Sequence, residues 1–425
     1  MSLRSSPMSR FLVSGLALVA ALAVASCAGA PASTAPVTQS PVVSAVATQA
    51  DRPDPVILIS IDGFRPDYLG RGATPVMDGL VAGGAFGPMR PSFPSVTFPN
   101  HYTLVTGLHP DHHGIVGNRF TDAELGVFTM ASKESGFWDQ AEPIWVSAEK
   151  AGVRTGTMFW PGSEVEIHGV RPSRWEPFDQ SMSGDARVDR ILSWLDLPAD
   201  QRPRFETLYF DIVDSAGHRH GPDAAETRAA VASVDASIGR LVEGLKARGL
   251  YDRTLLVLVS DHGMAATSPD RVVWIDDIID PAALQIGYGG AVLTADPAPG
   301  REAEVQQKLV GRHPHMECWN KADVPARLVY GSNPRVARIV CLVETGWLTA
   351  TRDRPVTRPG GAHGYDNQAP EMQALFIAHG PGVIPGRRLT DLDSVDVQPF
   401  LARMLGVTAP QGDGRAEDTL PVTTH

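Results

Sequence analysis

The sequence predicts an α/β fold in which helices flank a mostly parallel central sheet, with a small inserted lobe. Short apolar, β-branched runs that end near a polar residue recur along the chain, and stretches with helical periodicity lie between them. Strands that alternate with amphipathic helices are typical of crossover connections between parallel strands. A length of 425 residues allows one large domain or two smaller ones.

Residues 1–26 are predicted to be a signal peptide and no part of the fold. Arg4 and Arg10 precede an apolar segment over residues 11–26, which is too short for a good membrane-spanning helix. This segment leads into the motif VASC, which resembles a bacterial lipobox and implies cleavage before Cys27 and acylation of its thiol. An ordinary secretory signal is the alternative. Either reading predicts an extracytoplasmic protein, and lipidation would anchor it to the membrane of a bacterial cell envelope.

The remaining chain divides into a tether, one domain and a tail. Residues 27–53 are rich in Ala, Pro, Ser, Thr and Val without a period, as in a flexible linker. We predict one catalytic domain over residues 54–410 and a C-terminal tail over residues 411–425. Segments rich in Pro and Gly around 293–300 and 352–361 are interpreted as surface loops or as the inserted lobe.

The predicted strands are short and lead to acidic residues. The first is the run Val56–Ile61, which stops at Asp62. TLYFDIVD ends at Asp214, TLLVLVSDHG carries Asp261 after its apolar run, and RTGTMFW and ALFIAHGPG predict two more strands. Ligands of open α/β sheets bind beyond the carboxyl ends of the strands, so we expect these three aspartates at one edge.

One long helix is predicted between these strands. The segment AAETRAAVASVDASIGRLVEGLKARG places aliphatic residues on one stripe, and Gly249 suits the end of the helix. The stripe consists of Val231, Val234, Ile238, Leu241 and Leu245.

Histidines accompany the aspartates. His218 follows Asp214 by four residues, His262 is adjacent to Asp261, and His363 lies in a glycine-flanked loop. Mixed nitrogen and oxygen ligands suit zinc, with other divalent transition metals such as manganese or iron possible. With Asp62 there are six ligands, more than one tetrahedral zinc needs, and bimetallic hydrolases hold two ions about 3.5–4 Å apart. The sequence therefore predicts two divalent metals.

Thr97 is the hydroxyl that we expect to react. A lone Ser or Thr is a poor nucleophile at neutral pH, but a metal on its oxygen lowers the pKa of the hydroxyl. Thr97 precedes FPNHYTLVTGL, which can begin a helix with Pro99 in its first turn. Its hydroxyl would then lie where backbone N–H groups favour an anion. Ser92 and Ser95 do not open this helix and are the weaker candidates.

Six motifs occur together in the chain: ISIDG, PSVTFPNHYTLVTG, HGIVGN, DxxGHxxGP, SDHGM and GxHGYDN. Their combination, over residues from about 55 to 408, resembles the nucleotide pyrophosphatase/phosphodiesterase family of the alkaline phosphatase superfamily. The resemblance implies an alkaline-phosphatase-like fold, two Zn²⁺ ions and hydrolysis of phosphodiester or pyrophosphate bonds of nucleotides through a phosphothreonine intermediate.

The resemblance also implies a role for individual residues. One zinc ion would be held by Asp214, His218 and His363. The other would be held by Asp62, Asp261, His262 and the oxygen of Thr97. The expected substrate contacts are Asn118 to a phosphoryl oxygen, Phe98 stacked on the base, Tyr209 at the pocket wall and Trp175 as an opposing aromatic.

The net charge narrows the possible partners. With a formal charge of −11, the chain is a poor candidate for binding the phosphates of a nucleic acid polymer, because such binding relies on positively charged side chains. Small nucleotides or phosphodiesters remain possible if bound metals reverse the local field. A phosphomonoesterase or phosphonate hydrolase of the same superfamily, and a lipid-anchored nucleotide-binding protein, are the alternatives. The sequence leaves the physiological substrate and the oligomeric state open.

Two cysteines, Cys318 and Cys341, lie within the predicted domain. Neither belongs to a CxxC or Cys/His zinc pattern. They could form a disulfide in an oxidising compartment, or they could be two separately buried thiols.

Overall fold

A computed structural model describes residues 53–419 and 423 of the chain. They belong to one compact unit, Ala45–His425. The signal peptide, nearly all of the tether and the lipidation site at Cys27 lie outside the described residues, so these predictions stay predictions. No helix within 53–419 is long and apolar enough to cross a membrane.

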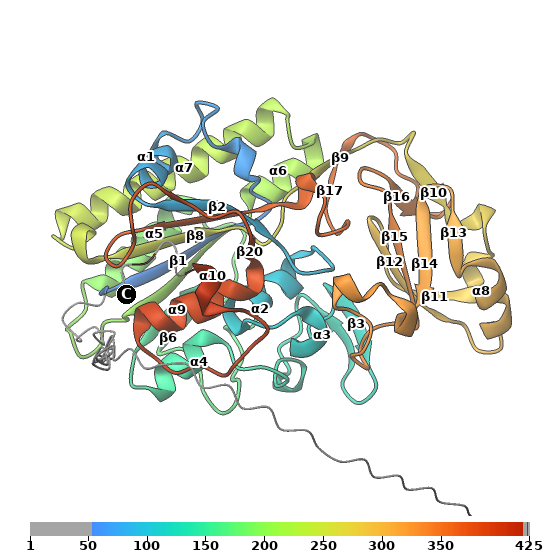
Figure 1. The fold of residues 1–425 in the computed structure, drawn as a ribbon, viewed down its shortest axis with the longest axis horizontal. Helices are drawn as coiled ribbons and strands as arrows, with labels where there is room; N and C mark the ends of the chain where they lie inside the picture. Colours follow the sequence, from blue (N-terminus) through green and yellow to red (C-terminus); the bar gives the residue numbers. More distant parts are fainter. Residues whose placement is uncertain (1–52, 420–422, 424–425) are drawn as a thin grey trace, which may run out of the picture. The chain divides into compact units, whose positions relative to one another are not determined.

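A mostly parallel sheet forms the centre of the fold, as predicted (Figure 1). Its strands follow the order β19-β2-β18-β8-β1-β7-β5-β6, and β20 also pairs with β2. Only β18 runs antiparallel to its neighbours β2 and β8. The strands are β1 Val56–Ile61, β2 Ala85–Arg90, β5 Thr155–Met158, β6 Arg174–Glu176, β7 Phe205–Phe210, β8 Leu255–Val259, β18 Ala374–His379, β19 Arg387–Arg388 and β20 Leu392–Asp393.

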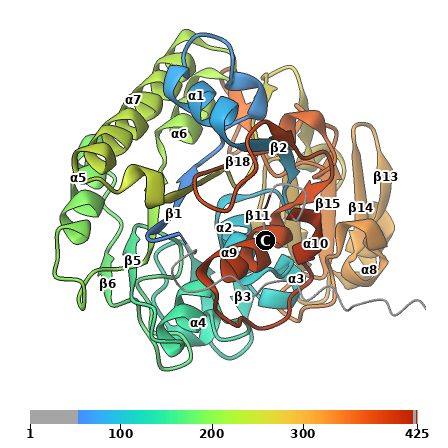
Figure 2. The ribbon, with the colours of Figure 1, turned by 60° about the vertical axis from the view of Figure 1, so that its left-hand side comes forward.

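Helices cover both faces of this sheet because its central strands alternate their side chains between two cores (Figures 1 and 2). Val56 and Leu58 of β1 pack in one core, whereas Ile57 and Ile59 pack in the other. One face carries α2 Thr97–Thr106, α3 Pro110–His113, α4 Ile144–Lys150 and α9 Val397–Leu405. The other carries α1 Pro75–Gly83, α5 Gly184–Leu195, α6 Ile212–His220 and α7 Ala225–Ala247. The predicted long helix is α7.

The inserted lobe is built around a five-stranded antiparallel sheet with the order β11-β12-β15-β14-β13. The segment around 293–300, read from its Pro and Gly content as a loop or lobe, supplies most of β12. Cys318 and Cys341 face each other on β14 and β15 and form a disulfide. The elements are β11 Leu284–Tyr288, β12 Val292–Pro297, α8 Glu302–Lys308, β13 Gly311–His313, β14 Met316–Asn320 and β15 Ile339–Val343.

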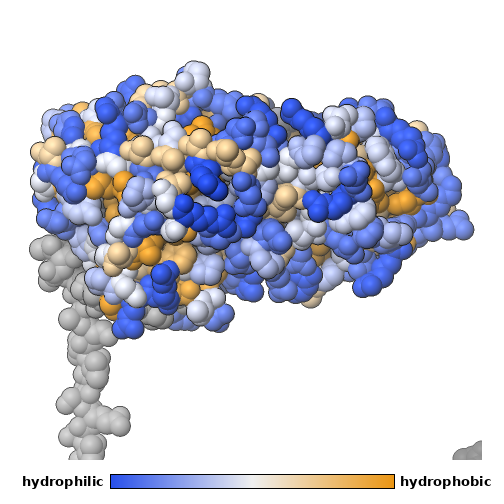
Figure 3. Space-filling model, turned by 90° about the horizontal axis from the view of Figure 1, so that it is seen from above, coloured by the Kyte–Doolittle hydropathy of each residue, from blue (hydrophilic) through white to orange (hydrophobic). Residues whose placement is uncertain are grey.

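Small ribbons and a short α-helix lie outside the two large sheets, and short 3-10 helices join several of the elements. The ribbons and this α-helix are β3 Arg119–Asp122 with β4 Gly126–Thr129, β9 Ala265–Thr267 with β17 Gly360–Ala362, β10 Val272–Trp274 with β16 Leu348–Ala350, and α10 Ala416–Thr419. The described part of the predicted tail is hydrogen-bonded to the domain, since the backbone N–H of Asp413 donates to the carbonyl of Gly107 at 2.7 Å. Hydrophilic residues cover most of the face in Figure 3, with hydrophobic ones in small groups.

Candidate active site

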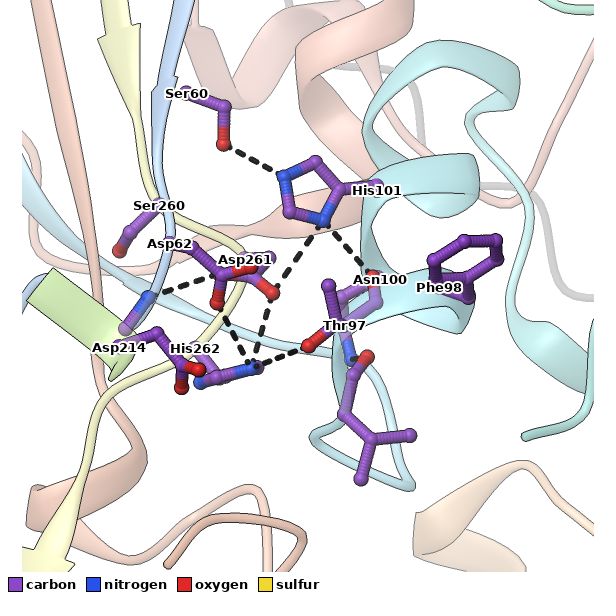
Figure 4. Close-up of polar contacts among 12 residues, drawn as sticks. Ser60, Asp62, Thr97, Phe98, Asn100, His101, Asp214, Ser260, Asp261 and His262 are labelled. Carbon is purple, nitrogen blue, oxygen red and sulfur yellow. Dashed lines mark hydrogen bonds and ion pairs between the residues drawn. The ribbon is translucent and has the colours of Figure 1, made fainter. Parts of the chain in front are cut away.

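Two loops and one helix beyond the central sheet carry the predicted aspartates to one place (Figure 4). Asp62 directly follows β1, and Asp261 lies two residues after β8. The N–H of Gly63 donates to Oδ1 of Asp261 at 3.2 Å, which joins these two loops. The expectation that Asp214 ends a strand is wrong: β7 stops at Phe210, and Asp214 lies in the first turn of α6. The chain turns into a helix there, and the helix still delivers the carboxylate to the same edge.

Asp62, Asp261 and His262 form one buried cluster beside Thr97. Nε2 of His262 lies 3.0 Å from Oδ2 of Asp261 and 3.5 Å from Oδ1 of Asp62. The same nitrogen lies 3.4 Å from Oγ1 of Thr97. Thr97 begins α2, as predicted, with Val96 as its N-cap. These four residues are those that the resemblance assigned to one metal.

Asp214, His218 and His363 form a second cluster. Oδ1 of Asp214 lies 3.4 Å from Nε2 of His218 and 3.5 Å from Nε2 of His363. The His262 and His363 rings stack with centroids 3.5 Å apart, so the two clusters adjoin. The cluster contains the residues assigned to the other metal, although these two assignments themselves stay predictions.

Backbone carbonyls orient all three imidazoles. Nδ1 of His218 donates to the carbonyl of Gly361 at 2.8 Å, and Nδ1 of His363 donates to that of Ser95 at 2.9 Å. Nδ1 of His262 donates to the carbonyl of Gly263, also at 2.9 Å. A carbonyl can only accept, so each Nδ1 carries the proton. Nε2 of each neutral ring is then left as a metal ligand.

Glycine is required at position 361 for this arrangement. A Cβ there would lie 2.6 Å from the carbonyl oxygen of Gly217 and 2.8 Å from Sδ of Met264. The close approach of the 360–362 strand to α6 is what brings the Gly361 carbonyl within reach of His218.

The unpaired oxygens in these clusters fit metal binding. Oδ1 of Asp62, Oδ1 of Asp214 and Oδ2 of Asp261 are buried without a hydrogen-bond partner. Unpaired buried carboxylates are costly unless a cation compensates them. Carboxylate oxygen together with imidazole nitrogen is a donor set that zinc, manganese and iron accept. The residues present therefore fit a divalent metal centre.

Burial and mutual repulsion shape the titration of these groups. Burial, with the nearby Asp261 and Asp214, raises the pKa of Asp62 well above its usual value, and burial also raises the pKa of Asp214. At Asp261 burial acts in the same direction, but the His262 and His101 imidazoles outweigh it and hold its pKa well below the usual value. Burial and the other two imidazoles lower the pKa of His363, which favours the neutral, ligating form.

A cavity of about 800 Å³ opens from the clusters. Its wall includes aromatic side chains, among them Phe98, Trp160 and Phe178. Asn118 also lines it, and Oδ1 of Asn118 accepts from the N–H of Phe98 at 2.9 Å. A large, mostly apolar wall beside the two clusters of candidate metal-binding side chains suits a substrate with a ring system and a phosphate.

The predicted substrate contacts divide into those at the cavity and one away from it. Tyr209 lines the cavity, and its hydroxyl donates to Oδ2 of Asp62 at 2.6 Å. Trp175 is not among the lining residues; the residue is 38% exposed, and its ring lies against the Arg171 guanidinium. Phe178, two residues after the end of β6, lines the wall instead.

Sequence reasoning missed two buried residues behind the site, His101 and Ser60. His101 lies one helical turn after Thr97, so the helix period already placed the two on the same face. Ser60 lies on β1 two residues before Asp62. The signals in the sequence were their spacing from Thr97 and Asp62 and their places within the motifs PSVTFPNHYTLVTG and ISIDG.

Comparison with known proteins shows extensive similarity. A sequence model of the type I phosphodiesterase / nucleotide pyrophosphatase family matches residues 56–366. A pyrophosphatase/phosphodiesterase of Schizosaccharomyces pombe is 40% identical over 393 residues, which cover 86% of this chain and 80% of the relative. The bis(5'-adenosyl)-triphosphatase of Xenopus laevis is 36% identical over 86% of this chain and 80% of its own length.

Longer relatives and a solved structure match the same region. Ectonucleotide pyrophosphatase/phosphodiesterase family member 3 of Bos taurus is 36% identical over 85% of this chain, which spans 43% of that relative. The structure of murine ectonucleotide pyrophosphatase/phosphodiesterase 5, an inactive threonine-to-alanine variant in complex with AMP, has a TM-score of 0.84 and 32% identity. The match covers 87% of this chain and all of that one.

Proposed function

This chain belongs to the type I phosphodiesterase / nucleotide pyrophosphatase family and is a hydrolase of that type, and from this premise we propose its reaction. It hydrolyses phosphodiester or pyrophosphate bonds of nucleotides and related small diesters, with two divalent metals, preferably Zn²⁺, and Thr97 as the nucleophile. AMP in the murine relative's structure supports a nucleotide substrate.

The position of the Thr97 hydroxyl carries this proposal. Thr97 is the first residue of α2 and lines the cavity. Its Oγ1 lies 3.4 Å from Nε2 of His262. Three buried carboxylate oxygens without hydrogen-bond partners lie in the same site. A hydroxyl between a cation-binding set and a helix N-terminus is placed to attack an anionic phosphoryl group.

Different residues of the chain would have different roles in the reaction. Metals held by the two clusters would lower the pKa of the Thr97 hydroxyl and neutralise phosphoryl charge. Thr97 Oγ forms a bond to phosphorus while the bond to the leaving oxygen breaks, which releases an alcohol or a nucleotide. Water then attacks the phosphorus and the bond from Thr97 Oγ to phosphorus breaks, which releases the phosphomonoester and restores the Thr97 hydroxyl. Asn118 would donate its amide to a phosphoryl oxygen, and the aromatic wall beside Phe98 would hold the base.

The cavity favours a diester over a monoester. Within the described lining, Lys133 is the one cationic side chain, and its Nζ is paired with Glu164 at 2.6 Å. A phosphomonoester carries an extra negative charge that usually needs additional cationic groups. The metal-loaded protein should therefore hydrolyse bis-p-nitrophenyl phosphate with a higher kcat/KM than p-nitrophenyl phosphate. The reverse preference would favour a monoesterase, and no turnover of either would favour the binding-protein alternative.

We also propose that the mature protein acts outside the cytoplasm and is anchored through lipidated Cys27. The VASC motif supports this, as do relatives named ectonucleotide pyrophosphatase/phosphodiesterases. Mass spectrometry of the membrane fraction tests it, because an acylated N-terminal Cys27 is expected and an unmodified N-terminus would contradict it.

A further inference from the structure

His101 is a fully buried histidine of α2, the helix that Thr97 begins, and its ring faces Asp261 (Figure 4). Its Nδ1 donates to the backbone carbonyl of Thr97 at 2.9 Å. The same nitrogen lies 3.4 Å from Oδ2 of Asp261, one of the buried oxygens without a hydrogen bond. The ring edge therefore faces both Thr97 and Asp261.

The acceptors around this nitrogen define the tautomer. The Thr97 carbonyl can only accept a hydrogen bond, so Nδ1 carries the proton, and the nearby Asp261 carboxylate favours the same tautomer. On the opposite edge, Nε2 lies 2.8 Å from the hydroxyl of Ser60, which is fully buried on β1. In the neutral ring the Ser60 hydroxyl donates to Nε2, and this second bond keeps the proton on Nδ1.

Aromatic neighbours hold the ring in place. The Trp160 and Tyr209 rings meet it edge-to-face, with centroids 5.1 and 5.2 Å away. Nε1 of Trp160 also donates to the backbone carbonyl of His101 at 3.1 Å. Ring packing of this kind leaves little freedom for rotation.

We propose that His101 is a positioning residue for the reaction at Thr97. Its Nδ1–H fixes the first turn of α2 relative to the Asp261 carboxylate, so that the Thr97 oxygen meets the phosphoryl group in line. Ser60 supports this role by holding the tautomer. The inference rests on the proposed function, since it assigns how the nucleophile of that reaction is aligned.

Two amide substitutions separate the two ring edges. The side-chain nitrogen of asparagine lies as many bonds from Cα as Nδ1, whereas that of glutamine corresponds to Nε2. His101→Gln should lower kcat on bis-p-nitrophenyl phosphate by roughly 10- to 100-fold, as expected for a misplaced nucleophile, with KM and bound metal close to wild type. His101→Asn should restore most of that loss.

A matched control removes another buried imidazole. His113 is also fully buried, and its Nε2 lies near Thr103 Oγ1 and the Pro99 carbonyl, at 3.0 and 3.1 Å. His113→Gln should leave kcat near wild type in the folded protein. Equal kcat losses in His101→Gln and His101→Asn, or a loss that follows loss of metal, would overturn the proposal. If His101→Gln does not fold, Ser60→Ala serves instead, and kcat unchanged in that variant would overturn it.

The tautomer can be read without turnover. Long-range ¹H–¹⁵N NMR spectra of the imidazoles, assigned by the signal lost in His101→Asn, should show His101 protonated at Nδ1. A ring protonated only at Nε2 would overturn the inference even in an active enzyme. Absence of diester hydrolysis by the wild-type protein would instead contradict the proposed function, while the NMR result still decides the orientation of His101.

Discussion

Nε2 of His363 lies 3.0 Å from Nε2 of His218, although Nδ1 of each ring already donates to a backbone carbonyl. Two neutral imidazoles in this arrangement direct lone pairs at each other. A shared cation removes that repulsion, and Asp214 supplies an oxygen 3.4 to 3.5 Å from both nitrogens. This relationship supports a metal centre independently of any sequence motif.

Thr97→Ala should lower kcat by roughly 10³-fold or more while the protein keeps its metal, because the attacking oxygen is removed and the ligand clusters remain. Steady-state rates and metal analysis on the same sample measure both. Ser95→Ala is the matched control: the Ser95 hydroxyl donates to the Tyr365 carbonyl and is not among the cavity-lining groups. Near-normal turnover in Thr97→Ala would refute covalent catalysis.

His218→Ala should remove about one metal equivalent per chain and lower kcat roughly 100-fold, because it deletes one ligand of the second cluster. The His218 side chain is 44% exposed, so the folded structure should survive its loss. His220, on the same helix and exposed, provides the control, and His220→Ala should keep both metal and rate. Inductively coupled plasma mass spectrometry measures the metal. Equal metal loss in the two variants would contradict the assignment.

The free energy of unfolding should fall between pH 6.5 and pH 3, in part through His113. Burial lowers the pKa of His113 to about 3, so the unfolded chain binds a proton there that the folded chain does not. Stability is then complete above the unfolded pKa and is lost as pH falls, by about 1.4 kcal/mol per pH unit for one proton. Urea titrations of the wild type and His113→Gln should show a smaller pH slope in the variant; identical slopes would contradict it.

Glu206→Gln should stabilise the protein at pH 8 more than at pH 5. Both carboxyl oxygens of Glu206 are buried without hydrogen-bond partners, and burial raises its pKa well above the usual value. A raised carboxyl pKa means that stability present at low pH is lost as pH rises. Urea unfolding at the two pH values measures the difference, with exposed Glu243→Gln as control. A variant less stable than wild type at pH 8 would argue against a buried, unpaired carboxyl.

The parallel sheet and most of the candidate metal-binding residues could be predicted from the sequence, because short local motifs indicate them. An apolar run followed by Asp62 is a local pattern, and the edge of a parallel sheet gathers such residues from distant segments. Asp214 was placed on the wrong element because DIVD can extend a strand or begin a helix, and only packing beside α7 decides between them.

The remaining features depend on tertiary contacts. Trp175 and Phe178 are both aromatic, and their residue types alone do not decide that Phe178 lines the cavity whereas Trp175, on β6, does not. The motif around Thr97 includes His101 but not its partners, because its contacts with Ser60 and Asp261 join segments 41 residues and more apart. The sequence indicated the antiparallel lobe only through Pro- and Gly-rich segments. Which strands of the lobe pair, and in which register, depends on contacts between distant segments and cannot be read from their composition.

Metal analysis of the purified, active protein tests the central claim most directly. We expect close to two tightly bound divalent transition-metal ions per chain, loss of diester hydrolysis in EDTA and recovery when Zn²⁺ is returned. Full activity in a preparation that holds no such metal and is indifferent to EDTA would contradict the account.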